Sequence, residues 1–114
     1  MSIRNLKQYI RNLWDWGFLE GAFGRSNIGV TDIDGLIEHN GQFLVIEAKS
    51  VGAPVPLGQR ILFSRLASIP QFTVVVIWGD APDAVQSFCI WGKKAKRCDT
   101  AAFKRWVSEW YAKT

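Results

Sequence analysis

Apolar residues near the start of the chain recur at three- and four-residue intervals, which is the spacing of one helix face. The run extends from Ile3 to Trp14 and follows Ser2, a residue type that favours the N-cap position. This pattern predicts an amphipathic helix over residues 3–15. Glycines at several positions between 17 and 29 interrupt any regular pattern there and predict a loop before the next element.

The next pattern predicts a β-hairpin centred on Asn40 and Gly41. Both central residues of a type I′ turn have positive φ, a conformation that the Asn-Gly pair adopts readily. The flanking segments 33–38 and 42–49 are apolar enough to form its two strands. In the second strand, alternate positions give one face with Phe43, Val45 and Glu47 and another with Leu44, Ile46 and Ala48. Because both faces are largely apolar, we expect this strand to be covered on both sides.

The second half of the chain predicts two helices and two strands. Glycine and prolines interrupt residues 50–56, and residues 57–68 then predict a helix. Apolar β-branched and aromatic residues over 72–78 predict a strand buried on both faces, and 84–91 predicts another strand. Asp99 is a candidate N-cap for a last helix. The apolar stripe of that helix would consist of Phe103, Trp106, Val107, Trp110 and Tyr111.

These elements follow the order helix, hairpin, helix, strand, strand, helix. A helix that connects a hairpin to a buried strand implies a mixed central sheet flanked by helices on both faces. The sequence therefore predicts an α/β fold. The length of 114 residues, with no internal repeat and no linker, predicts a single domain over residues 1–114.

Composition narrows the possible functions. The chain is 48% hydrophobic and 21% charged, and no apolar run approaches the roughly 20 residues of a membrane span. The first residues lack the apolar core of a signal peptide, so we expect a cytoplasmic protein with no membrane partner. Two cysteines and one histidine are too few for a zinc site. The net charge of +4 favours an anionic partner, but only weakly.

Three charged residues around the hairpin suggest chemistry. Glu47 and Lys49 are two positions apart and so share a strand face, and the hairpin can bring Asp34 alongside them. Two carboxylates and an ammonium group at the end of a sheet suit a divalent metal and an attacking water. A simpler interpretation makes Asp34 a turn residue and the other two an exposed pair. The predicted covering of the strand argues against it, because burying charge is unfavourable without a function.

The string Asp34…Glu47-Ala48-Lys49, followed by Gln59 in a helix, resembles the PD-(D/E)xK nuclease superfamily. It is most similar to the small Holliday-junction-resolvase-like and VRR-NUC-like members, including phage-encoded ones. The resemblance implies a restriction-endonuclease-like αβββαβ core and metal-dependent hydrolysis of DNA phosphodiester bonds by an endo- or exodeoxyribonuclease. The chain lacks the proline that precedes the acidic residue in the family motif.

This resemblance implies a role for each residue of the motif. Asp34 and Glu47 would bind Mg²⁺, for which Mn²⁺ should substitute, and the backbone carbonyl of Ala48 would add a third oxygen. Lys49 would position or deprotonate the attacking water and offset charge on the phosphate. Gln59 would orient the water or a phosphate oxygen from the start of its helix.

Two further acidic residues are candidate metal ligands. Asp32 lies on the same strand face as Asp34, and either a second metal or a structural hydrogen bond would account for it. Glu20 follows the first predicted helix, a region from which related nucleases often supply an acidic residue.

Basic residues are candidates for contacts with the phosphate backbone of DNA. They occur on the second predicted helix and in a predicted loop before the last one: Arg60, Arg65, Lys93, Lys94, Lys96 and Arg97. No base-reading pattern is visible, so we expect selectivity for DNA structure, not for sequence. The small size of the domain suggests a homodimer. The alternative function is a non-catalytic nuclease-fold protein that binds nucleic acid or inhibits a host defence system.

Overall fold

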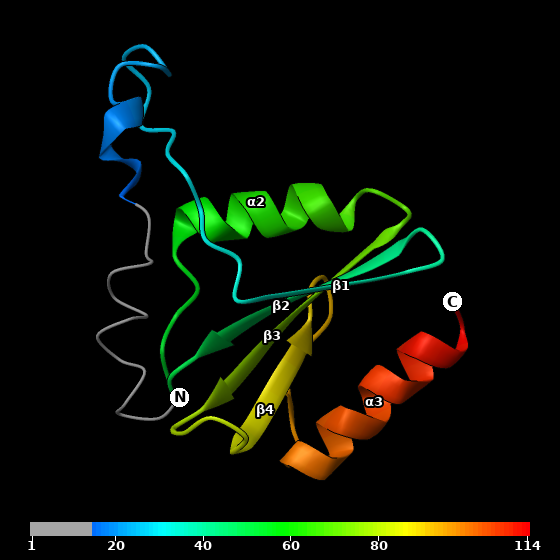
Figure 1. Ribbon diagram of the computed structural model, residues 1–114. Coiled ribbons are helices and arrows are strands. Elements are labelled where there is room, and N and C mark those ends of the chain that lie inside the picture. Colours follow the sequence, from blue (N-terminus) through cyan, green and yellow to red (C-terminus); the bar gives the residue numbers. More distant parts are fainter. Residues whose placement is uncertain (1–14) are drawn as a thin grey trace, which may run out of the picture. The chain divides into compact units, whose positions relative to one another are not determined.

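The computed structural model describes residues 15–114 of the chain (Figure 1). The chain divides into two compact units, Met1–Thr31 and Asp32–Thr114. The helix predicted over residues 3–15 falls almost entirely outside the described residues. The prediction that residues 1–114 form a single domain stays a prediction.

The described part of the first unit is a short helix followed by turns. The 3-10 helix η2 spans Trp16–Leu19, and its N-cap, Asp15, accepts a hydrogen bond at Oδ1 from the Gly17 N–H at 2.9 Å. Gly21 and Gly24 have φ values of 85° and 65°, a region that glycine adopts without steric penalty. The predicted glycine-rich loop is therefore confirmed, with one turn of 3-10 helix at its start.

The second unit is built on one mixed sheet. Its strands lie side by side in chain order, with β1 and β5 at the two edges. Only β2 and β3 pair in parallel, and the other neighbours are antiparallel. The strands are β1 (Gly35–His39), β2 (Gln42–Lys49), β3 (Phe72–Gly79), β4 (Val85–Ile90) and β5 (Lys96–Arg97). The predicted α/β class with a mixed central sheet is confirmed.

The hairpin between β1 and β2 forms at the predicted turn. Asn40 and Gly41 have φ values of 51° and 77°, as a type I′ turn requires. His39 pairs with Gln42 directly beside the turn, and the Gly41 N–H donates to Glu38 Oε2 at 2.8 Å. Because the turn sets the register, it also determines which residues of the two strands lie opposite each other.

Two helices cover the two faces of the sheet (Figure 1). Helix α2 spans Leu57–Ala67 and makes the crossover that two adjacent parallel strands require. Helix α3 spans Thr100–Ala112, and Asp99 caps it by accepting a hydrogen bond at Oδ1 from the Ala102 N–H at 2.8 Å. Both helices, and the Asp99 cap, agree with the sequence prediction.

Alternate residues of β2 and β3 enter two separate cores. On the α2 side the buried residues are Val45, Phe63, Val74 and Val76. On the α3 side they are Leu44, Val75, Phe88 and Phe103. Burying each of these side chains stabilises the fold by about 1.5–3 kcal/mol. The two central strands are thus covered on both faces, as the apolar pattern predicted.

Two features of the second unit differ from the sequence prediction. Lys96 and Arg97 form the edge strand β5 against Ser87 and Phe88, whereas the basic cluster was predicted to lie in a loop. A strand of only two polar residues has no periodic pattern in the sequence. It forms through its pairing with β4. Within residues 15–114, two strands precede α2, whereas an αβββαβ core has three. The specific restriction-endonuclease-like order is therefore not established.

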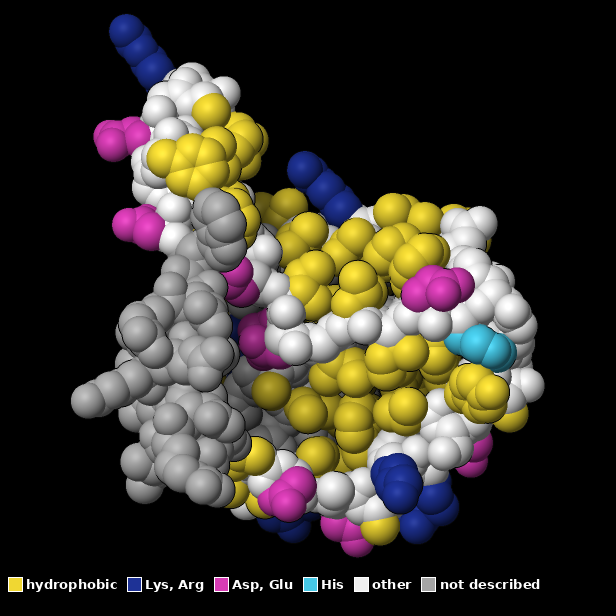
Figure 2. Space-filling view, viewed as in Figure 1, with side chains coloured by type: hydrophobic (Ala, Val, Ile, Leu, Met, Phe, Trp, Pro, Cys, Tyr) yellow, Lys and Arg dark blue, Asp and Glu magenta, His cyan; other side chains and the backbone are white. Residues whose placement is uncertain are grey.

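The outer edge of β1 exposes hydrophobic side chains. Leu36 is 55% exposed and Ile37 is 38% exposed, on opposite faces of the strand. Figure 2 shows hydrophobic side chains on both sides of the strip of backbone that crosses the viewed face. Within residues 15–114, no helix has the length and hydrophobicity that a membrane crossing requires.

Candidate active site

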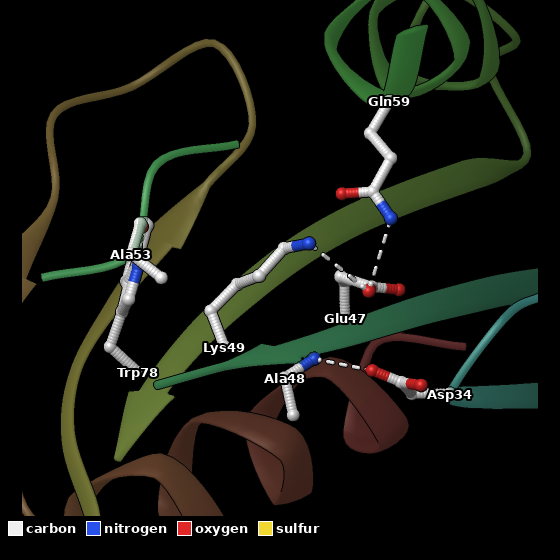
Figure 3. Close-up of polar contacts among 7 residues, drawn as sticks. All are labelled: Asp34, Glu47, Ala48, Lys49, Ala53, Gln59 and Trp78. Carbon is white, nitrogen blue, oxygen red and sulfur yellow. Dashed lines mark hydrogen bonds and ion pairs between the residues drawn. The ribbon is translucent and has the colours of Figure 1, made fainter. Parts of the chain in front are cut away.

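Glu47 lies at the centre of the candidate site, close to the carboxyl end of β2. It is 6% exposed and is the only charged residue classed as buried within residues 15–114. Gln59, in the first turn of α2, donates from Nε2 to Glu47 Oε1 at 3.3 Å, and Lys49 Nζ lies 3.6 Å from the same oxygen (Figure 3). The two-residue spacing on one strand face, together with the crossover to α2, brings these three side chains together.

Asp34 reaches the site from the residue just before β1. The last pair of the hairpin joins Gly35 to Ile46, so β1 ends before it can pair with Ala48. There Asp34 Oδ2 accepts a hydrogen bond from the Ala48 N–H at 2.9 Å (Figure 3). The carboxylate takes the position that a backbone carbonyl of a longer β1 would occupy. The hairpin therefore brings Asp34 beside the Glu47–Lys49 segment.

The charge on Glu47 is unfavourable in this environment. Burial raises the pKa of Glu47 above its ordinary value of 4.5, and the nearby Asp34 carboxylate raises it further. The Lys49 ammonium group and the hydrogen bond from Gln59 lower it, but they do not offset the first two effects. Lys49 is itself largely covered, with 16% of its side chain exposed. A cation beside the two carboxylates would remove the repulsion between them.

The oxygen donors of the site match a hard divalent cation. Asp34 and Glu47 supply carboxylates, and magnesium sites in proteins usually contain only one or two of these. The side-chain oxygen Oε1 of Gln59 is buried and has no hydrogen-bond partner. The N–H and C=O of one strand residue point to the same edge, so the Ala48 carbonyl faces the side on which Asp34 lies. Among residues 15–114, no three His, Cys, Asp or Glu side chains form a group that could hold a metal ion.

Of the two additional acidic candidates, Asp32 is not brought into these contacts. Asp32 is exposed, two residues before Asp34. The second candidate, Glu20, lies in the first unit, where it is the exposed C-cap of η2.

The basic candidates lie in two separate places. Arg60 and Arg65 are exposed on α2, and Arg60 directly follows Gln59. The cluster of Lys93, Lys94, Lys96 and Arg97 is exposed at and before β5. Two strands separate β5 from β2, so the backbones of β2 and β5 are about 14 Å apart at a spacing of about 4.8 Å per strand. Helix α2 is the nearer source of positive charge.

Trp78 is a supporting residue that the sequence did not identify. It lies opposite Lys49 in the parallel pairing of β2 and β3, and its indole Nε1 donates to the Ala53 carbonyl at 2.8 Å (Figure 3). This bond holds the loop that connects Lys49 to α2 and hence to Gln59. The only signal in the sequence is a tryptophan at the end of an apolar strand, which equally predicts a core residue.

Comparisons with protein-family models, with curated proteins and with solved structures found no match to this chain.

Proposed function

We propose that this chain is a metal-dependent deoxyribonuclease of the PD-(D/E)xK type that hydrolyses DNA phosphodiester bonds. The observation that carries the proposal is a buried carboxylate, Glu47, in contact with Lys49 and Gln59 and close to a second carboxylate, Asp34. These are the residues that the motif Asp…Glu-x-Lys with a downstream glutamine would use.

Asp34, Glu47 and the Ala48 carbonyl would hold Mg²⁺ or Mn²⁺ in this proposal. Their oxygen chemistry suits either ion, and the raised pKa of Glu47 supports the need for a positive charge there. When bound, the ion would polarise the phosphate and make a bound water more acidic.

The remaining residues act on the water and the phosphate. Lys49, with its ammonium group 3.6 Å from Glu47 Oε1, would orient the water and neutralise charge on the phosphate. Gln59, which contacts Glu47 through Nε2, would orient the water or a phosphate oxygen from the first turn of α2. The water oxygen bonds to phosphorus as the bond to the leaving sugar oxygen breaks, which gives a phosphate monoester and a hydroxyl.

DNA is the proposed partner, bound through its phosphate backbone. Arg60 and Arg65 are exposed on the helix that carries Gln59, so they are suited to follow the strand away from the scissile phosphate. We propose that the nuclease selects its substrates by DNA structure. We also propose that it acts in the cytoplasm.

The same proposal includes a homodimer. Among residues 15–114, β1 is an edge strand of the sheet, and its exposed Leu36 supplies an apolar contact. Sedimentation of the wild type beside Leu36→Lys tests this: a dimer that the variant weakens is expected, and a monomeric wild type contradicts the proposal.

A catalytic role accounts for this site better than a purely binding role. A nucleic-acid binder gains from exposed positive charge, whereas Glu47 is a buried negative charge whose ionisation is disfavoured. Residues that reduce stability in this way are common at functional sites, where a substrate or cofactor compensates.

The decisive experiment is cleavage of linear, nicked, branched and single-stranded DNA in the presence of Mn²⁺. We expect the wild type to cleave at least one of these substrates and Lys49→Ala to be slower by about 100-fold or more. Lys104→Ala is the matched control, because Lys104 is an exposed lysine on α3 that is not among the candidate DNA contacts, and its rate should stay within about twofold of wild type. Absence of any cleavage, or equal cleavage by Lys49→Ala, would refute the proposal.

A further inference from the structure

A cavity opens beside the candidate site, at the carboxyl ends of β2 and β3. Its volume is about 430 Å³, and its walls come from the last residues of β2 and β3 and from the segment that connects β3 to β4. Ala48 and Lys49 belong both to this cavity and to the candidate site. A molecule bound at the site can therefore extend into the cavity without leaving the protein surface.

The connecting segment is held in place by specific contacts. The Thr100 hydroxyl donates to the Asp83 carbonyl and accepts from the Val85 N–H, the latter at 3.0 Å, which ties the segment to the start of α3. Asp80 Oδ1 accepts from the Val51 N–H at 3.4 Å, which ties it to the loop after β2. These contacts preorganise the cavity, so a ligand would not have to order it.

The chemistry of the walls selects the ligand. Most of the lining is apolar, with contributions from Ile77, Trp78 and Val85. The charged groups on the β3–β4 side are the carboxylates Asp80 and Asp83. Two carboxylates disfavour a phosphate, whereas an apolar, flat and neutral group can pack against such walls. In a nucleic-acid substrate, the nucleobase is the part with these properties.

We propose that this cavity receives an unpaired nucleobase next to the scissile phosphate. The inference rests on the proposed nuclease function, and it specifies the substrate class: DNA with a base free to leave the stack, as in single strands, flaps and branch points. A continuous duplex would first have to extrude the base, with the loss of its stacking and pairing. The cavity is thus a selectivity element for DNA structure.

Binding without cleavage tests the cavity separately from the nuclease function. The wild type is titrated, without divalent cation, with a short single-stranded oligonucleotide that carries either a full set of bases or one abasic position. We expect about tenfold weaker binding when the abasic position is the one that the cavity receives, found by moving it along the oligonucleotide. Equal affinity for all these oligonucleotides overturns the inference.

Three variants then locate the effect. Ala81→Trp fills the cavity from the β3–β4 segment, so its affinity for the oligonucleotide should no longer depend on the base. Ala112→Trp, at the far end of α3, is the control and should keep this dependence. Asp83→Asn removes one carboxylate, and asparagine tolerates the φ of 63° at this position. It should strengthen binding of the abasic oligonucleotide by a few-fold. Base dependence that survives in Ala81→Trp, with the variant folded by circular dichroism, contradicts the assignment.

The two proposals fail in different ways. Base-dependent binding in a protein that cleaves no DNA would leave the cavity assignment standing and end the nuclease proposal. Cleavage by a wild type that binds abasic and complete oligonucleotides equally would end the cavity assignment alone.

Discussion

At the scale of one residue, Glu47 illustrates how the proposed function and stability would oppose each other. Its carboxylate is buried, close to Asp34, and only partly compensated by Lys49 and Gln59. A structural ion pair would be expected to stabilise its charged form, and here the net effect on the pKa is the reverse. The residue therefore reduces stability at neutral pH, and its replacement is informative.

We predict that Glu47→Gln is more stable than wild type at pH 7 and does not cleave DNA. The folded state holds the Glu47 proton more tightly than the unfolded state, because the pKa is raised above 4.5. Protonated Glu47 therefore makes its full contribution to the stability of the folded state below about pH 4.5. This contribution is lost as the pH rises through the raised pKa of Glu47. Urea unfolding at several pH values should show that the free energy of unfolding of the variant rises relative to that of wild type over this pH range. The difference at pH 7 should be on the order of 1 kcal/mol.

The control for this experiment is Glu109→Gln, which removes an exposed carboxylate on α3. It should not change how the free energy of unfolding depends on pH. A Glu47→Gln variant that is less stable than wild type at pH 7 would show that the Glu47–Lys49 pair is primarily structural.

Gln59 makes a second prediction at this scale. Its Nε2 donates to Glu47 Oε1 and lowers the pKa of that carboxyl group. In Gln59→Leu the donor is lost, so the pKa of Glu47 should rise further, which an NMR titration of its carboxyl carbon can measure. We expect cleavage to slow by about tenfold or more, because the group proposed to orient the water is also lost. Gln86→Leu, an exposed substitution on β4, should leave both quantities unchanged.

At the scale of elements, local patterns identified most of the second unit. The Asn40-Gly41 turn, the doubly covered β2 and the Asp99 cap each have a signal within a few residues, and the structure confirms all three. Strand β5 was missed, because two polar residues form a strand only through their partner. A strand that depends wholly on its neighbour leaves no trace in its own sequence.

The hairpin turn can be tested by comparing a glycine in the turn with a glycine in α2, because replacing each with alanine should change stability in opposite directions. Gly41 has a φ of 77° and open space around it, so Gly41→Ala should lower the free energy of unfolding by about 1 kcal/mol through backbone strain alone. Gly58, in α2, also has open space around it but no positive φ. Gly58→Ala should raise the free energy of unfolding by about 0.5–1 kcal/mol. Urea unfolding measures both, and shifts of the same sign would contradict the assigned turn.

The contacts of the candidate site were predictable only as far as one element determines them. Glu47 and Lys49 share a face by strand periodicity, and the hairpin accounts for the approach of Asp34. The bond from Trp78 to Ala53 was not predictable, because it depends on the parallel register of β2 and β3. That register pairs residues far apart in the sequence, so no short segment carries a signal for it.

At the scale of the whole molecule, metal binding and folding should be coupled. An ion held by Asp34 and Glu47 binds the folded chain alone, since the unfolded chain does not bring the two residues together. At an ion concentration one hundred times its dissociation constant, the stabilisation would be about 2.7 kcal/mol. We predict that Mn²⁺ raises the melting temperature of the wild type, with a smaller effect at pH values low enough to protonate Glu47.

The variant that tests this coupling is Asp34→Asn, because its side-chain oxygen can still accept the hydrogen bond from the Ala48 N–H while its charge is gone. The Mn²⁺-dependent shift should fall to a small fraction of the wild-type value, whereas Glu109→Gln should keep the full shift. The repulsion that raises the pKa of Glu47 would also be lost in Asp34→Asn, so this variant should be more stable than wild type in the absence of the ion. An equal shift in wild type and Asp34→Asn would mean that the ion binds elsewhere on the chain, and the proposed nuclease site would then lack its cofactor.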